Sequence, residues 1–156
     1  MKRTLALLIA TSGYVGYFPI APGTAGSLAG LAVFAAIRAA ASPALEVALI
    51  VVVLVAGIWA AGIAESVLGQ EDPGPVVIDE VLGMLVTLAL LPVSWVGALT
   101  GFVLFRLFDI VKPYPANRLE RLHGGTGIML DDAMAGVYAY AVLRVLILVW
   151  PRWFTT

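Results

Sequence analysis

The sequence has 156 residues, of which 62% are hydrophobic and only 12% are charged, and its formal net charge at pH 7 is −1. Its mean hydropathy of +1.02 is far above that of an ordinary soluble domain, and the weak charge argues against a nucleic-acid partner, which would call for a clustered basic surface. The chain contains no cysteine, which excludes disulfides, thiolate metal sites and a cysteine nucleophile. These features predict an integral membrane protein with a single domain, residues 1–156.

The first residues imitate a secretory signal peptide. Lys2 and Arg3 precede the short apolar segment 5–10. That segment is short for the apolar part of a signal peptide, and no A-x-A cleavage site follows it. We therefore expect it to be retained as an interfacial segment.

Four further segments are long and apolar enough to lie in lipid. They are residues 25–41, 47–64, 81–105 and 133–150. The second carries no charge and is the clearest predicted membrane-spanning helix. The third is also uncharged but contains Pro92, so it predicts either one tilted span or two short helices that fold back on each other.

We favour a helical hairpin around Pro92, because it returns the charged residues after this segment to the side that holds the preceding acidic motif. Residues 80–91 would rise only about 18 Å, which is too little to cross a hydrocarbon core of about 30 Å. Such short helices must be sheltered by their neighbours. The expected fold class is therefore all-α, an integral membrane helical bundle with about four to five apolar helices.

The hairpin divides the basic residues unequally between two sides. The side with the polar motifs holds Lys2, Arg3, Arg106, Lys112, Arg118 and Arg121, and the other side holds Arg38, Arg144 and Arg152. By the positive-inside rule, the side with the polar motifs is predicted to be cytoplasmic.

Two pairs of adjacent acidic residues are the main candidates for a functional site. Asp79 and Glu80 are predicted to begin one apolar helix, and Asp131 and Asp132 another. One acid can cap a helix N-terminus. A second acid adds little further stability to the helix, and it costs up to about 3 kcal/mol if it enters lipid. Four converging carboxylates repel one another unless cations lie between them, and such hard oxygen ligands suit Mg²⁺ or Mn²⁺.

A basic motif, "FRLFDIVKPYP", follows the third apolar segment. Arg106 and Asp109 are three residues apart and share a helix face, and Lys112 comes just before a proline. In one interpretation, Arg106 and Lys112 bind lipid headgroups and Asp109 pairs with Arg106. In the other, Arg106 clamps a phosphate with two hydrogen bonds, Lys112 adds a point charge, and Asp109 is a catalytic orienting group or a metal ligand.

Two glycine-rich stretches, "APGTAGS" and "HGGTG", each precede a predicted helix. Backbone N–H groups at such places can bind an anion, and Thr24 and Ser27 are added as phosphate-binding candidates. His123 has no second histidine beside it and is expected to be a surface residue. Asp72, in "DPG", is interpreted mainly as a turn former, and as a metal ligand only in second place.

Carboxylates, Arg and Lys together with glycine-rich loops indicate metal-assisted phosphoryl chemistry at the bilayer surface. Two other classes stay open. A membrane phospholipid headgroup transferase would use the same acids, but would need a second pocket and an acceptor alcohol. A non-enzymatic, cation-binding transport subunit would need its acids at the membrane midplane.

The motifs "APGTAGS", "DPGPVVIDEVLG", "FRLFDIVKPYP" and "GGTGIMLDDAMAGVYA" resemble, in this order, those of the phosphatidylglycerophosphatase A family, and they cover residues 21–139. The resemblance implies a Mg²⁺-dependent phosphatase of the bacterial inner membrane that hydrolyses phosphatidylglycerophosphate to phosphatidylglycerol and phosphate. On the matching positions it implies an acidic site of Asp79, Glu80, Asp131 and Asp132, with Arg106, Asp109 and Lys112 beside it.

Within this site, we expect Glu80 and Asp131 to be metal ligands. Asp79 and Asp132 are expected to be further ligands or the catalytic base that orients a water. The expected partners are the lipid substrate and the surrounding bilayer.

Overall fold

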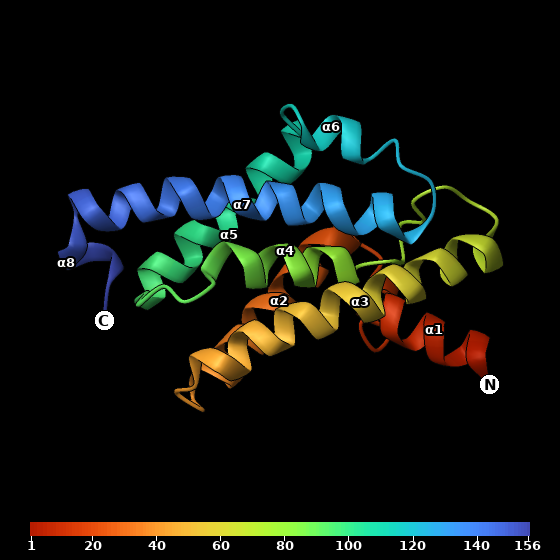
Figure 1. The fold of residues 1–156 in the computed structure, drawn as a ribbon, viewed down its shortest axis with the longest axis horizontal. Coiled ribbons are helices and arrows are strands. Elements are labelled where there is room, and N and C mark those ends of the chain that lie inside the picture. The colour runs from red at the N-terminus through yellow and green to blue at the C-terminus, as the bar shows by residue number, and fades with distance from the viewer.

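The computed structural model describes residues 1–156 and is all-helical, which confirms the predicted α class (Figure 1). Its eight α-helices are α1 (Lys2–Ala10), α2 (Pro22–Arg38), α3 (Pro43–Leu68), α4 (Ile78–Leu88), α5 (Trp95–Val111), α6 (Ala116–Leu119), α7 (Gly125–Val149) and α8 (Pro151–Phe154). A short 3-10 helix, η1 (Val15–Tyr17), lies between α1 and α2.

Local sequence signals set both ends of α3 and the start of α5. The Ser42 hydroxyl caps α3 by accepting a hydrogen bond from the Leu45 N–H at 3.3 Å, and α3 ends at Gly69, whose φ of 69° is a left-handed conformation suited to glycine. Ser94 caps α5 in the same way, because its hydroxyl accepts from the Gly97 N–H at 3.2 Å. Each of these helices therefore begins at a serine that replaces a missing intrahelical partner.

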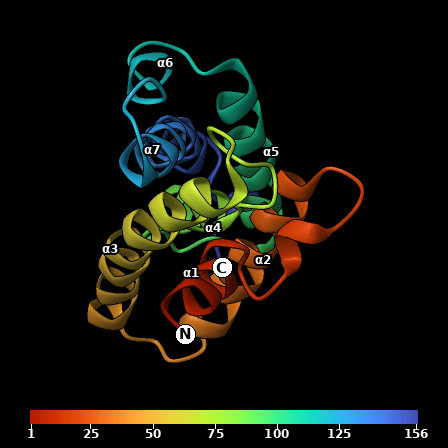
Figure 2. The ribbon, with the colours of Figure 1, turned by 90° about the vertical axis from the view of Figure 1, so that its right-hand side faces the viewer.

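Helix α4 lies at the centre of the bundle, with α2, α3, α5 and α7 packed around it (Figures 1 and 2). Nine of its 11 residues are buried. An 11-residue helix rises only about 16 Å, so α4 is sheltered by longer helices, as the sequence predicts for the short helices of a hairpin.

The predicted hairpin is present. The apolar segment 81–105 is broken by a turn around Pro92, and Gly83 in α4 lies directly against the ring of Phe105 in α5. Helix α5 continues beyond this segment as far as Val111. The first part of the basic motif is therefore helical and returns alongside α4.

Two charged side chains hold the turn of the hairpin from outside. Glu46, near the start of α3, accepts a hydrogen bond from the Leu90 N–H at 2.6 Å, and the Arg38 guanidinium at the end of α2 donates to the Leu91 carbonyl. Backbone groups of the turn that have no helical partner are thus satisfied by side chains. This also places the turn at the same end of the bundle as the start of α3.

Two helices, α3 and α7, are long and apolar enough to cross a membrane. In their most apolar stretches only 22% and 33% of the residues are buried, so each helix packs one side against the core and leaves other apolar residues exposed or partly exposed. Helices α2 and α5 have 17 residues each. The structure thus supports two candidate spans, fewer than the four to five apolar helices expected from the sequence.

The arrangement predicts that the two ends of α3 label from opposite sides of a membrane. Ser94 lies at the hairpin end, and Gln70 follows the other end of α3. Because the chain has no cysteine, Ser94→Cys and Gln70→Cys each introduce a single reactive thiol. With the positive-inside orientation, an impermeant maleimide added outside intact cells should modify only Ser94→Cys, and Gln70→Cys should react only after permeabilisation. Labelling of Ser94→Cys from the cytoplasmic side would contradict this topology.

Candidate functional site

A polar pocket of about 280 Å³ lies where α2, α4, α5 and α7 meet the loop before α4. Its lining residues are Ala21, Pro22, Gly23, Asp72, Pro73, Gly74, Val76, Asp79, Glu80, Arg106, Asp109, Lys112, Asp131 and Asp132. The pocket therefore gathers residues from all four polar motifs, which are far apart in the sequence.

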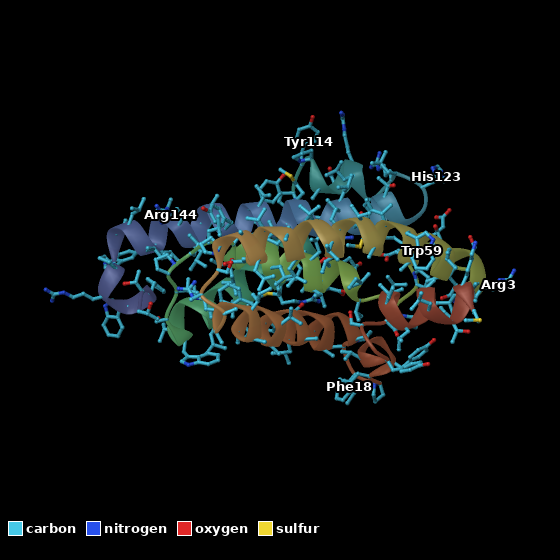
Figure 3. The ribbon with its side chains drawn as sticks, turned by 60° about the horizontal axis from the view of Figure 1, so that its bottom comes forward. Arg3, Phe18, Trp59, Tyr114, His123 and Arg144 are labelled. Atoms are coloured by element: carbon cyan, nitrogen blue, oxygen red, sulfur yellow. The ribbon has the colours of Figure 1, made fainter.

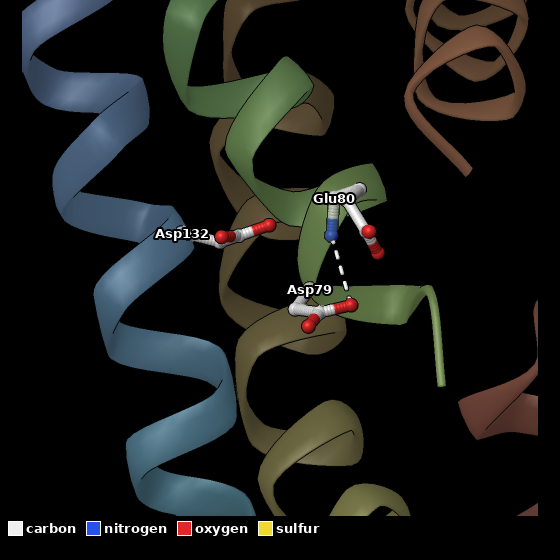
Figure 4. A group of neighbouring side chains, drawn as sticks. All are labelled: Asp79, Glu80 and Asp132. Atoms are coloured by element: carbon white, nitrogen blue, oxygen red, sulfur yellow. Dashed lines mark hydrogen bonds between the residues drawn. The ribbon is translucent and has the colours of Figure 1, made fainter. Parts of the chain in front are cut away.

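Three carboxylates face one another in this pocket (Figure 4). Asp79 and Glu80 lie in the first turn of α4, Asp132 lies on α7, and one oxygen from each comes within 4.8 Å of the others. Asp79 and Asp132 are only 7% and 3% exposed. We call these residues the acidic trio.

A backbone contact between α4 and α7 brings the trio together. A Cβ on Gly136 would lie 2.6 Å from the Gly83 carbonyl oxygen, and a Cβ on Gly83 would lie 3.0 Å from the Asp132 carbonyl oxygen. Gly83 follows Asp79 by four residues, and Gly136 follows Asp132 by four, so the closest approach lies one turn from the acids. Glycine at both positions allows the two helices to approach this closely.

The acidic trio has the properties of a divalent-cation site. The Glu80 Oε2 and Asp132 Oδ2 atoms are buried without a hydrogen-bond partner, and the Glu80 N–H donates to Asp79 Oδ1 at 3.0 Å. Burial, followed by the charges of Glu80 and Asp132, raises the pKa of the Asp79 carboxyl well above its usual value. Buried carboxylate oxygens without donors fit a hard cation such as Mg²⁺, which would supply the missing partners.

Arg106 is held on the wall of the pocket by contacts within its own helix, α5, and with α2 and α4. Its Nη1 donates to Asp109 Oδ2 at 2.5 Å, donates to Ser27 Oγ on α2 at 3.4 Å, and lies 3.9 Å from Glu80 Oε1. The Ser27 hydroxyl itself donates to the Gly23 carbonyl at 2.8 Å. Arg106 pairs with Asp109, as in the first of the two interpretations of the basic motif, and Ser27 contacts Arg106 and does not line the pocket.

Lys112 binds Asp131 of the second acidic pair, and also Glu120. At the end of α5, its Nζ lies 2.6 Å from Asp131 Oδ2 and 3.0 Å from Glu120 Oε1. Burial lowers the pKa of the Lys112 ammonium, but its hydrogen bonds and charge attraction to Asp131 and Glu120 outweigh this and raise the pKa above its usual value. Lys112 is therefore protonated at neutral pH.

The two acids of the second pair face different partners. Asp131 contacts Lys112, whereas Asp132 belongs to the acidic trio. Helix α7 begins at Gly125, so both acids lie inside the helix and not at its start as the sequence suggested. They therefore do not cap the N-terminus of α7.

Other residues differ in their distance from the pocket. Thr24 does not line it, and His123 lies in a neighbouring pocket. Asp72 does line it, and burial raises the pKa of its carboxyl against the opposing effect of Lys112. No sequence signal selects Glu120, because its contact with Lys112 depends on how the chain folds from the end of α5 through α6.

A family model and two named relatives indicate one family, and a third relative carries a different name. The family model of phosphatidylglycerophosphatase A matches residues 8–147. A protein of Bacteroides thetaiotaomicron, provisionally named a phosphatidylinositol-3-phosphatase, is 41% identical over 93% of this chain and 96% of its own length. Phosphatidylglycerophosphatase A of Escherichia coli is 36% identical over 92% of this chain and 84% of its own length. Phosphatidylglycerophosphatase A of Haemophilus influenzae is 35% identical over 87% of this chain and 85% of its own length. No solved structure gives a significant match.

The contact between α4 and α7 predicts the effect of a single methyl group. Gly136→Ala would place a Cβ against the Gly83 backbone, which cannot move aside as a side-chain tip can. We expect this substitution to lower the free energy of unfolding by about 1–3 kcal/mol. Gly74→Ala is the control, because a Cβ there meets nothing within 4 Å, and it should change stability by less than about 0.5 kcal/mol. Thermal denaturation in detergent compares the two, and equal stability would contradict the close contact.

Proposed function

The chain belongs to the phosphatidylglycerophosphatase A family, and on that premise we propose that it hydrolyses the phosphomonoester of phosphatidylglycerophosphate in a Mg²⁺-dependent reaction. The products are phosphatidylglycerol and phosphate. The observation that carries this proposal is the acidic trio with its unpartnered oxygens, in one pocket with Arg106 and Lys112. Such a pocket combines ligands for a hard cation with donors for phosphate.

The acidic trio, Asp79, Glu80 and Asp132, would hold the ion. The chemistry that Mg²⁺ supplies when bound there is Lewis-acid polarisation of the phosphoryl group and activation of a water. Within the trio, Asp79 and Asp132 are the candidates for the general base that takes a proton from the attacking water. As the water oxygen bonds to phosphorus, the bond from phosphorus to the glycerol oxygen breaks, and that oxygen takes up the proton that the base removed from the water.

The two basic residues would hold the phosphate. The Arg106 guanidinium is oriented by Asp109 and Ser27, and its planar group can give two parallel hydrogen bonds to phosphoryl oxygens. Lys112 adds a positive charge that Asp131 holds in place. In this proposal Asp132 is the metal ligand of the second pair, and Asp131 acts through Lys112.

We place the protein in the bacterial inner membrane as a multi-pass protein with the pocket on the cytoplasmic side. The support is the apolar exposure of α3 and α7 and the larger number of basic residues at the end that holds the polar motifs. Figure 3 shows Arg3 and His123 at this end and Arg144 towards the other. The bilayer that surrounds the protein is also the source of its substrate.

The first test is phosphate release from phosphatidylglycerophosphate by the detergent-purified protein. We expect release with Mg²⁺ and none with excess chelator, because the trio's carboxylates cannot bind an anionic substrate without a countercharge. Mn²⁺ should restore activity. Release that continues in chelator would contradict the metal dependence, and no release from a folded, lipid-supplemented sample would contradict the proposed reaction.

Phosphatidylinositol 3-phosphate is a second candidate substrate, because the relative from Bacteroides is named for it and is 41% identical. Both lipids present a phosphomonoester to the same acids and cations. The same assay with each lipid compares kcat/KM, and a higher value for the inositol lipid would reassign the substrate within the same chemistry. Product that forms only when an acceptor alcohol is added would instead support a headgroup transferase.

The two acids of α7 should differ in their effect on metal binding. Asp132→Asn removes a trio carboxylate, so we expect Mn²⁺ affinity, measured by electron paramagnetic resonance, to fall about tenfold or more. Asp131→Asn loosens Lys112 instead and should reduce phosphate release mainly through a higher KM, with Mn²⁺ affinity little changed. Loss of Mn²⁺ binding in Asp131→Asn but not in Asp132→Asn would reverse these roles.

A further inference from the structure

The segment between α1 and α2 presents large apolar side chains to the outside. Tyr14, Tyr17, Phe18 and Ile20 are 58%, 50%, 56% and 75% exposed, and residues 11–25 contain no charged side chain. Phe18 points away from the bundle (Figure 3). A contiguous apolar surface of this kind is unfavourable in water and indicates contact with an apolar partner.

This segment is held firmly on the bundle. Gly16 is buried against the Pro75 backbone, and the Val77 N–H donates to the Ala10 carbonyl at 2.9 Å. The Tyr14 N–H donates to the Thr11 hydroxyl at 3.0 Å. The exposed side chains therefore extend from a fixed backbone. This backbone is anchored to the loop containing Pro75 and Val77, which leads directly into α4 and its acids.

The end of α5 provides a second exposed apolar surface. Leu107 and Ile110, which share a helix face, are 53% and 73% exposed, and Tyr114, just beyond the end of the helix, is 67% exposed. Arg106 and Asp109 lie on the adjacent face and line the pocket. The apolar and the phosphate-binding surfaces of α5 thus meet along one edge of the helix.

Both apolar surfaces border the pocket. The first one leads directly into Ala21, Pro22 and Gly23, which line it, and the second lies beside Arg106 and Asp109 on α5, which also line it. Figure 2 shows the orange-red loop that leads into α2 beside α5. Tyr114 and Phe18 lie on opposite sides of the bundle (Figure 3), so the two apolar surfaces reach the pocket from different sides. We call the four residues Tyr14, Tyr17, Phe18 and Ile20 the entry surface.

We propose that the entry surface holds the glycerol backbone and acyl chains of the phospholipid substrate while its phosphomonoester reaches Arg106 and Lys112. This rests on the proposed function. The pocket is lined mainly by charged and small residues, so acyl chains inside it would leave those charges desolvated without partners. The uncharged surface that is continuous with the pocket accepts the chains without this cost. The positive charges at the border complement the anionic end of the same molecule.

The occupant can be identified without an activity measurement. Phe18→Cys, labelled with a polarity-sensitive fluorophore in the otherwise cysteine-free chain, is placed in phosphatidylglycerol vesicles with and without nitroxide-labelled acyl chains. We expect strong quenching by these chains, and little at the polar control position Gln70→Cys. Equal quenching at both positions would overturn the proposal. A label at position 18 that is shielded from lipid and quenched by a second labelled copy would assign the surface to self-association.

Kinetics then test whether the surface positions the substrate. The double variant Phe18→Ser with Ile20→Ser should lower kcat/KM for long-chain phosphatidylglycerophosphate in vesicles about tenfold or more, because two apolar side chains lose lipid contact. Hydrolysis of the dihexanoyl substrate, dissolved as a monomer, should stay within about twofold of the unmodified protein. Trp153→Ser is the control, since Trp153 is 69% exposed at the opposite end of the bundle, and both of its activities should be unchanged.

The outcomes separate the two proposals. Equal loss with both substrates, or loss with neither, would overturn the entry surface while leaving the phosphatase reaction in place. If the unmodified protein hydrolyses neither substrate, the proposed function fails, and the quenching experiment still decides whether lipid acyl chains occupy the surface.

Discussion

The contact between the backbones of α4 and α7 at Gly83 and Gly136 is the constraint on which the site depends. It places Asp132 against Asp79 and Glu80 inside the bundle, where ionised groups without partners are costly. Burying three carboxylates together is not a way to stabilise a fold. The arrangement is understandable as a site that binds positive charge.

Acidic side chains outnumber basic ones along the pocket. Six carboxylates line it but only two basic side chains, Arg106 and Lys112, and each basic side chain is already paired with an acid. A phosphomonoester would therefore meet net negative charge. A divalent cation on the trio would offset two of these negative charges, and it would leave Arg106 and Lys112 oriented by Asp109 and Asp131. In the proposed function, the acids that pair with the basic residues position them, and the trio binds the cation.

The sequence predicted the elements that depend on local signals and missed those set by packing. The break at Pro92 and the shared helix face of Arg106 and Asp109 follow from backbone restriction and helix periodicity, and both are confirmed. Adjacent residues of a helix point about 100° apart, so Asp131 and Asp132 cannot both face α4, and only the packing of α7 decides between them. The early start of α7 was missed because Gly and Thr, which usually mark turns, here form its first turn. The roles of the site residues stay predictions.

The central position of α4 has a consequence for how the protein is made. An 11-residue helix with two acids in its first turn is too short and too polar at one end to enter a bilayer as an independent unit. It becomes stable there only when α2, α3, α5 and α7 enclose it, and α7 is synthesised last of these. The chain therefore emerges from the ribosome with its acids apart, and the complete site is assembled only after nearly the whole polypeptide has been inserted. A truncated product lacking α7 would have Asp79 and Glu80 but no Asp132 opposite them, and so no preformed site for a cation.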